Sequence, residues 1–114
     1  MLKGVDIKET VEYVSPSDAG DNPTKFILGN ISNRDKLTLF ADAINEKGEV
    51  DMKKVMSKAV DVVQAGLKGI KNLGGKDYDV ITEEIVDMLS FIIMSELVGK
   101  ILELNFVSEG QAKN

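Results

Sequence analysis

Residues 21–35, DNPTKFILGNISNRD, combine a turn, a short apolar strand and the start of a helix. Pro23 restricts the backbone at the turn, and residues 25–30 form the apolar run that we expect to be a strand. The Ser32 hydroxyl can accept a hydrogen bond from the free amides of the first helical turn, and Asp35 follows at capping-box spacing. The polar residues therefore have local structural roles, and the apolar centre is a strand that needs a neighbour.

The segment before this stretch supplies a candidate neighbour. Residues 5–14, VDIKETVEYV, place apolar side chains at alternate positions, with Glu9 breaking the row, which is typical of a strand with one buried face. The alternating apolar residues are Val5, Ile7, Val11 and Tyr13. Residues 15–23 are rich in turn formers, so segments 5–14 and 25–30 are predicted to pair as an antiparallel hairpin.

Two helices are predicted directly after the hairpin. The first covers about residues 34–46. The second begins after Asp51, which can cap it, and continues to the Gly74-Gly75 pair that ends it. Its apolar positions, three and four residues apart, give the clearest helical period in the chain. They are Met52, Val55, Met56, Ala59, Val63, Leu67, Ile70 and Leu73.

A third helix is predicted to start near Asp79 or Thr82 and to continue to about residue 104. Glu83 and Glu84 suit its positive end. Apolar residues cover more than one face of this helix, so we expect it to be the central helix or to present its second face to another subunit.

The predicted architecture is a single α+β domain, mainly helical, in which an N-terminal β-hairpin precedes three α-helices. Residues 1–31 would be the hairpin arm, residues 32–106 the helical core and residues 107–114 a polar tail. A lone hairpin is only marginally stable in water, so it must pack on the helices or extend a neighbour's sheet. The predicted partner-binding residues are Val5, Ile7, Val11, Tyr13, Phe26, Leu28, Phe91, Ile93, Leu97 and Leu104.

The glycines of the second predicted helix indicate close packing. Gly66 and Gly69 fall within its apolar pattern, where each costs about 1 kcal/mol relative to Ala. Ser95 and Gly99 offer a similarly small surface on the third helix. We therefore expect these two helices to cross closely at the small residues.

Composition argues against most chemistries. The chain of 114 residues contains no Cys and no His, which removes thiol catalysis, disulfides, Cys-ligated metals and the commonest general base. Asp18, Asp21 and Asn22 lack the ligand pattern of a calcium loop and are better explained by turn formation. No nucleophile–base pair is apparent, so we predict a protein without enzymatic activity, metal or cofactor.

The net charge of −5 argues against a nucleic-acid partner. Residues 51–76 are locally basic and the segment that follows is acidic, a pattern that suits pairing within the chain or between subunits. The first ten residues, MLKGVDIKET, contain no apolar signal core, so a cytosolic location is expected. Residues 88–94 are apolar but too short to span a membrane.

Residues 23–35 and 101–114 resemble regions of small structural and assembly proteins of tailed bacteriophages. In the first, Pro-Thr precedes a short apolar strand and a helix with early charges. In the second, a helix runs into Asn-Phe-Val-Ser-Glu and a polar tail ending in Lys-Asn.

The resemblance implies a tail-assembly chaperone, a head–tail connector or a minor virion protein. Such a protein would contact other phage morphogenesis or virion proteins and copies of itself, but neither nucleic acid nor membrane. It would act in the host cytoplasm during assembly or remain in the virion. The alternative is a small acidic regulatory binding module that blocks a basic surface of its partner.

Overall fold

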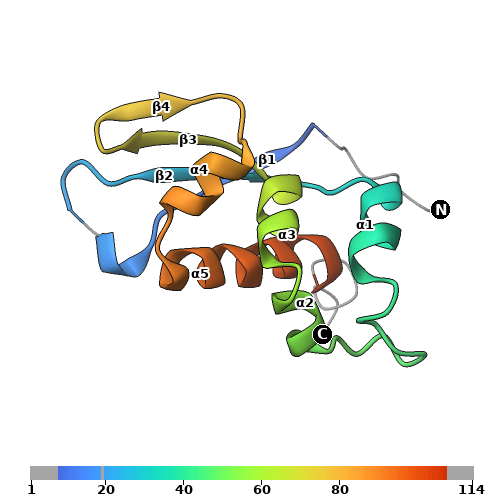
Figure 1. Ribbon diagram of the computed structural model, residues 1–114. Helices are drawn as coiled ribbons and strands as arrows, with labels where there is room; N and C mark the ends of the chain where they lie inside the picture. The colour runs from blue at the N-terminus through green and yellow to red at the C-terminus, as the bar shows by residue number, and fades with distance from the viewer. Residues whose placement is uncertain (1–7, 19, 108–114) are drawn as a thin grey trace.

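The computed structural model describes residues 8–18 and 20–107. Within them, four strands form one antiparallel sheet in the order β1-β2-β3-β4 (Figure 1). The strands are β1 (Thr10–Tyr13), β2 (Lys25–Gly29), β3 (Leu67–Leu73) and β4 (Lys76–Tyr78). The chain is therefore α+β, as predicted, but its sheet is larger than the predicted hairpin.

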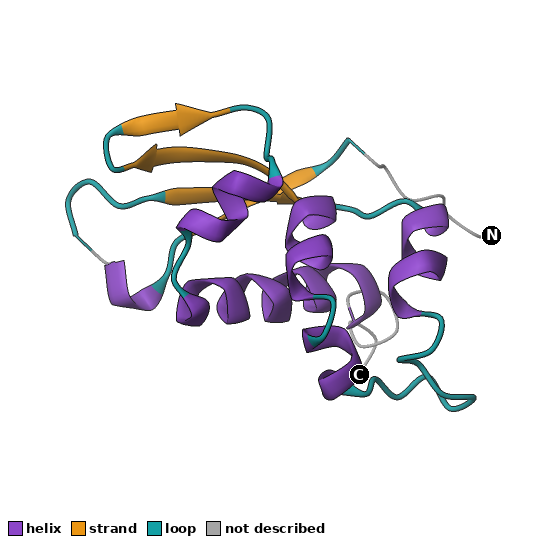
Figure 2. Cartoon of the chain, in the orientation of Figure 1, coloured by secondary structure: helices purple, strands orange, loops and turns teal. Residues whose placement is uncertain are grey.

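Helices gather on one side of this sheet (Figure 2). The α-helices are α1 (Asn33–Phe40), α2 (Met52–Met56), α3 (Ala59–Gly66), α4 (Glu83–Met88) and α5 (Phe91–Leu102). Two short turns complete the described structure, the 3-10 turn η1 (Pro16–Asp18) and the π-helical turn η2 (Glu103–Val107). Five α-helices thus replace the three that were predicted, because the second and third predicted helices are both interrupted.

The strand in the stretch 21–35 pairs on both sides. On one side, Val11 of β1 lies opposite Leu28 and Tyr13 lies opposite Phe26, so the predicted antiparallel pairing of these two segments is confirmed. On the other side, Ile70 of β3 lies opposite Phe26. The predicted strand residues Val5 and Ile7 lie outside the described residues.

The prediction of one helix from residue 52 to residue 73 is wrong. The helix is broken between α2 and α3, and residues 67–73 form strand β3. Gly74 and Gly75, with φ of 59° and 84°, join β3 to β4 in a two-residue loop, and tight hairpin loops of this kind require positive φ. Pairing with β2 on one side and β4 on the other supplies hydrogen bonds for the β3 backbone, which outweighs the local helical pattern.

The third predicted helix is also divided. Thr82 caps α4, since its hydroxyl accepts a hydrogen bond from the Ile85 amide, as expected from its position. Leu89 and Ser90 then adopt extended backbone conformations, and the Ser90 hydroxyl accepts from the Ile93 amide to begin α5. The second cap was not predicted because Ser90 stands inside a continuous apolar run.

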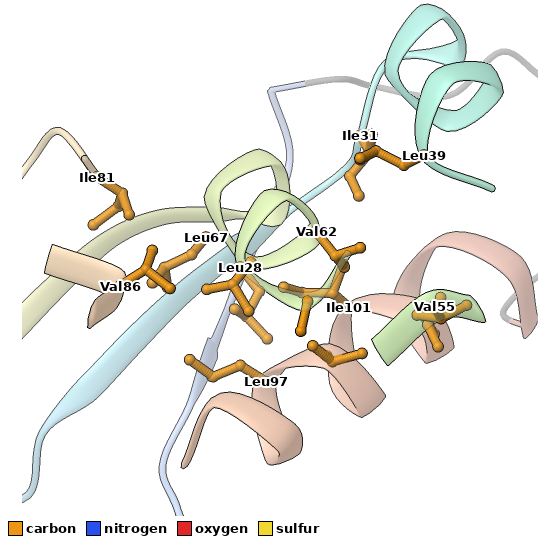
Figure 3. Close-up of a cluster of buried hydrophobic side chains, with 14 of the residues drawn as sticks. Leu28, Ile31, Leu39, Val55, Val62, Leu67, Ile81, Val86, Leu97 and Ile101 are labelled. Atoms are coloured by element: carbon orange, nitrogen blue, oxygen red, sulfur yellow. The ribbon is translucent and has the colours of Figure 1, made fainter. Parts of the chain in front are cut away.

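A single hydrophobic core lies between the sheet and the helices (Figure 3). Phe26, Leu28 and Ile70 project into it from the sheet, and Leu97 and Ile101 from α5, each of them at most 3% exposed. The Ser32 and Asp51 caps predicted for α1 and α2 are present, with side chains that accept hydrogen bonds from Asp35 and from Lys53 and Lys54.

One close helix contact of the predicted kind is present, but its partners differ. A Cβ atom placed on Gly66, at the end of α3, would lie 2.6 Å from Cγ2 of Ile101 on α5. The contact therefore joins Gly66 to Ile101. Gly99 is exposed, and a Cβ placed on it would meet nothing within 4 Å, so the predicted role of Gly99 is wrong. Gly69 lies in β3 and not in a helix.

Candidate protein-binding surfaces

Three large apolar side chains stand in solvent where α4 turns into α5. Met88 is the last residue of α4, and Phe91 and Ile92 are the first two residues of α5. Their exposed fractions are 60%, 69% and 71%. The Ser90 cap fixes the direction in which α5 begins, so it also positions this group, which we call the α4–α5 corner. Exposed apolar side chains grouped in this way make the corner a candidate protein-interaction site.

A shallow pocket of about 230 Å³ adjoins the corner. Phe26 and Leu73 contribute apolar side chains from the sheet, while Met88, Leu89 and Ile93 line the side formed by the helices. Ser15, Asp18, Thr24 and Ser90 also line this pocket. The Asp18 carboxylate accepts a hydrogen bond of 2.8 Å from the Thr24 amide, which fits the turn role expected of this acid. The pocket gives the corner a concave border.

A second apolar surface lies along α1. This α1 groove has a volume of about 470 Å³. The rings of Phe40 and Phe106 meet edge to face in its wall, with centroids 4.9 Å apart. The Leu37 side chain, 70% exposed, stands beside them. The complete lining is Asn33, Lys36, Leu37, Phe40, Ala41, Ile44 and Phe106.

Asn105 holds η2 against the start of α1. Its side-chain oxygen accepts a hydrogen bond of 2.8 Å from the Ile31 amide, and its side-chain nitrogen donates to the Ile101 carbonyl at 2.8 Å. Lys36 donates to the Asn105 carbonyl at 3.4 Å and places its ammonium group 5.3 Å from the centre of the Phe106 ring. These contacts fix Phe106, so the groove has a formed wall.

The predicted contact residues fall into several environments. Phe91 belongs to the corner, and Ile93 is half-buried beside it. Val11 is 43% exposed on the edge strand β1, whereas Tyr13 and Leu104 are half-buried against the core.

The remaining predicted contact residues are either buried in the core or outside the described residues. Phe26, Leu28 and Leu97 are buried in the core of the single chain, so their apolar character is explained by folding. Val5 and Ile7 lie outside the described residues. Met88 and Ile92 were not among the predicted contact residues, although their place in the apolar run beside Phe91 could have indicated them.

Tyr13 links the edge strand to α5. Its hydroxyl donates a hydrogen bond of 2.8 Å to the Glu96 carboxylate, and the Lys100 ammonium group lies 5.6 Å from the centre of its ring. Partial burial of Tyr13, followed by the hydrogen bond and the negative charge of Glu96, raises the pKa of the phenol above its ordinary value. This arrangement joins the edge strand β1 to α5.

Tyr13→Phe should reduce the loss of stability at alkaline pH. Because the folded state keeps the phenol protonated to a higher pH than the unfolded chain does, its stabilising contribution is complete below pH 10 and is lost as the pH rises further. At pH 7 the variant lacks the hydrogen bond to Glu96, so its free energy of unfolding should be lower by about 0.5–1.5 kcal/mol. Urea unfolding at pH 7 and at alkaline pH measures both effects, with Glu96→Gln as the matched variant. If the free energy of unfolding of Tyr13→Phe fell with rising alkaline pH as steeply as that of the wild-type chain, the raised pKa of Tyr13 would not be the cause of the loss.

The charged segments do not pair with each other inside the described structure. Among residues 8–18 and 20–107, ion pairs join Lys58 to Asp42 at 3.2 Å and Lys100 to Glu103 at 3.6 Å. The Lys58 ammonium group lowers the pKa of Asp42 through its hydrogen bond and its charge. Neither pair connects the basic segment 51–76 with the acidic segment that follows it.

The described residues contain no cluster of three or more Asp or Glu side chains that could hold a metal ion. In the same residues, no helix is both long enough and apolar enough to cross a membrane. Comparisons with protein-family models, curated proteins and solved structures give no match. The candidate function therefore rests on the two apolar surfaces and on the resemblance of residues 23–35 and 101–114.

Proposed function

We propose that this chain is a non-enzymatic bacteriophage virion or tail-morphogenesis protein that works through protein–protein contacts made by the α4–α5 corner. The observation that carries the contact role is the exposure of Met88, Phe91 and Ile92, which are 60–71% exposed. Methionine and phenylalanine are enriched in interface cores because they bury large apolar areas. Aromatic side chains that fill pockets of the partner are common anchors of protein interfaces.

The phage assignment has a separate basis. It comes from the resemblance of residues 23–35 and 101–114 to assembly proteins of tailed phages, and it specifies a tail-assembly chaperone, a connector or a minor virion protein. The partners are other morphogenesis or virion proteins, and no catalytic step or cofactor is involved. The protein would act in the host cytoplasm during assembly, and a structural subunit would remain in the particle.

A second candidate is supported by the charges around the corner. From residue 77 to residue 99 the chain has six acidic residues and no Lys or Arg. An apolar contact within an acidic segment fits a regulatory module that blocks a basic partner surface. In that case partner binding should weaken steeply as salt is raised, whereas binding dominated by the apolar corner should depend little on salt.

The test is co-expression of the tagged chain with virion and tail proteins. We expect one of these proteins to co-purify with the wild-type chain but not with the double variant Phe91→Ser/Ile92→Ser. Removing hot-spot side chains weakens binding by about 30-fold or more. The matched control is Val80→Ser, which removes an apolar side chain of similar exposure, 73%, away from the corner.

The location of the chain then separates the possible roles. Stoichiometric recovery in purified particles would indicate a structural subunit, and recovery only from lysate in complex with a tail protein would indicate a chaperone. Capture that survives in Phe91→Ser/Ile92→Ser would contradict the corner as the binding surface. Absence from both particles and complexes would contradict the phage assignment.

A further inference from the structure

The junction of α4 with α5, which carries the corner, and helix α1, which lines the α1 groove, lie on opposite sides of the molecule (Figure 1). The described fold is elongated, with principal extents of 43, 31 and 24 Å. On one side Phe91 and Ile92 project from the first turn of α5. On the other side Phe40, Phe106 and Leu37 form a hollowed apolar surface. The corner presents exposed apolar side chains, and the groove is a hollow lined mainly by apolar side chains, so the two surfaces suit each other.

The size of the groove is consistent with an occupant made of side chains. Its volume of about 470 Å³ lies in the range of concave sites that enclose small ligands, about 300–1,000 Å³. An exposed Phe–Ile pair is a group of that scale, and it is apolar, as is most of the lining. The edge-to-face contact of Phe40 with Phe106 and the hydrogen bonds of Asn105 hold the wall in place. A formed groove lowers the ordering cost of binding.

The charges of the two surfaces are also complementary. The corner lies in the segment from residue 77 to residue 99, whose charged residues are all acidic, and Asp87 is the nearest of them in sequence. The one charged residue in the groove lining is Lys36. Arg34 and Asp35, which are exposed on the same helix, oppose each other in charge. The groove lining therefore carries one positive charge, which suits an acidic, apolar projection.

We propose that the occupant of the α1 groove is the α4–α5 corner of a second copy of this chain. This inference rests on the proposed function of the corner as a protein-binding surface and identifies its partner. The contact uses different surfaces on the two copies, so it is heterologous. It leaves a free corner at one end of the pair and a free groove at the other, and repetition gives a closed ring or an open filament.

Two single-surface variants test this arrangement. Phe91→Ser/Ile92→Ser removes the projection and keeps the groove. Leu37→Glu keeps the projection and places a negative charge at the groove, and Leu37 is 70% exposed, so the fold can accept the change. By light scattering coupled to size exclusion, we expect the wild-type chain to self-associate and each variant alone to be monomeric. An equimolar mixture of the two variants should form a heterodimer and nothing larger.

The mixture is decisive because it contains one intact corner and one intact groove on different chains. If the mixture stays monomeric while the wild-type chain associates, the contact is symmetric or lies elsewhere, and the inference is overturned. A wild-type chain that is monomeric at its highest soluble concentration also overturns it, whether the groove is filled by residues 108–114 of the same chain or by another protein. Circular dichroism of both variants verifies that they are folded.

The failure of this inference is distinguishable from the failure of the proposed function. A monomeric wild-type chain that captures a virion protein through its corner would overturn only the head-to-tail contact. A heterodimer of the two variants, together with no capture of any virion protein, would support the contact and contradict the phage assignment.

Discussion

Leu97→Ala should lower the free energy of unfolding by about 2–5 kcal/mol, whereas Phe91→Ala on the same helix should change it by less than about 0.5 kcal/mol. Leu97 is fully buried between α5 and the sheet, and its truncation leaves a cavity in a packed core. Phe91 is 69% exposed, so its truncation removes few contacts within the chain. Urea denaturation of the two variants measures both values.

Partner binding should show the reverse order. Phe91→Ala should weaken capture of the partner, while Leu97→Ala, assayed at a temperature where it is folded, should bind as the wild-type chain does. If Phe91→Ala were as destabilising as Leu97→Ala, the side chain would belong to the core and the corner would not be a free surface. If Leu97→Ala alone abolished binding in the folded state, the contact would involve the opposite face of α5.

Leu97 and Phe91 also show which part of the α4–α5 corner could not be predicted from the sequence. Apolar side chains on more than one face of the segment predicted a central helix or a helix with a second face toward another subunit, but they did not indicate which face is buried in the single chain. Leu97 is buried because the sheet and α3 lie against its side of α5, and these elements come from distant parts of the chain. The turn at Leu89 and Ser90 sets the start of α5, and Ser90 is a local signal that could have been recognised as a cap.

The fold was predictable where local chemistry decides the structure. The helix starts at Ser32, Asp51 and Thr82 follow from short polar side chains that accept hydrogen bonds from free amides. The pairing of β1 with β2 follows from alternation and a turn-rich connection.

Strand β3 was not predictable in the same way. Leu67, Ile70 and Leu73 are spaced three residues apart, which fits a helix. They lie in a strand because β2 offers a long-range pairing partner and because Gly74-Gly75 permits a tight hairpin to β4. The Gly-Gly pair was interpreted as a helix end, although the same residues are favoured in two-residue hairpin loops. Pairing with β2 and β4 therefore decides the structure of residues 67–73. The predicted helix is present only before them, as α2 and α3, which end at Gly66.

Gly66→Ala should lower the free energy of unfolding by about 1–3 kcal/mol, the usual cost of inserting a methyl group into a filled core. The added Cβ would lie 2.6 Å from Cγ2, 2.8 Å from Cδ1 and 2.9 Å from Cγ1 of Ile101. Ile101 is fully buried and β-branched, so its side chain has little freedom to move away. The helices α3 and α5 would have to separate, and thermal or urea unfolding would record the loss.

Gly99→Ala is the matched control for this substitution. Gly99 lies inside α5, is exposed, and has nothing within 4 Å of a Cβ placed on it. Alanine there should raise the free energy of unfolding by about 0.5–1 kcal/mol through its higher helix propensity. The same chemical change is thus expected to have opposite signs at two glycines, and equal effects would contradict the close contact of α3 with α5 at Gly66. Because α5 also carries the α4–α5 corner, the contact at Gly66 fixes the helix from which Phe91 and Ile92 project.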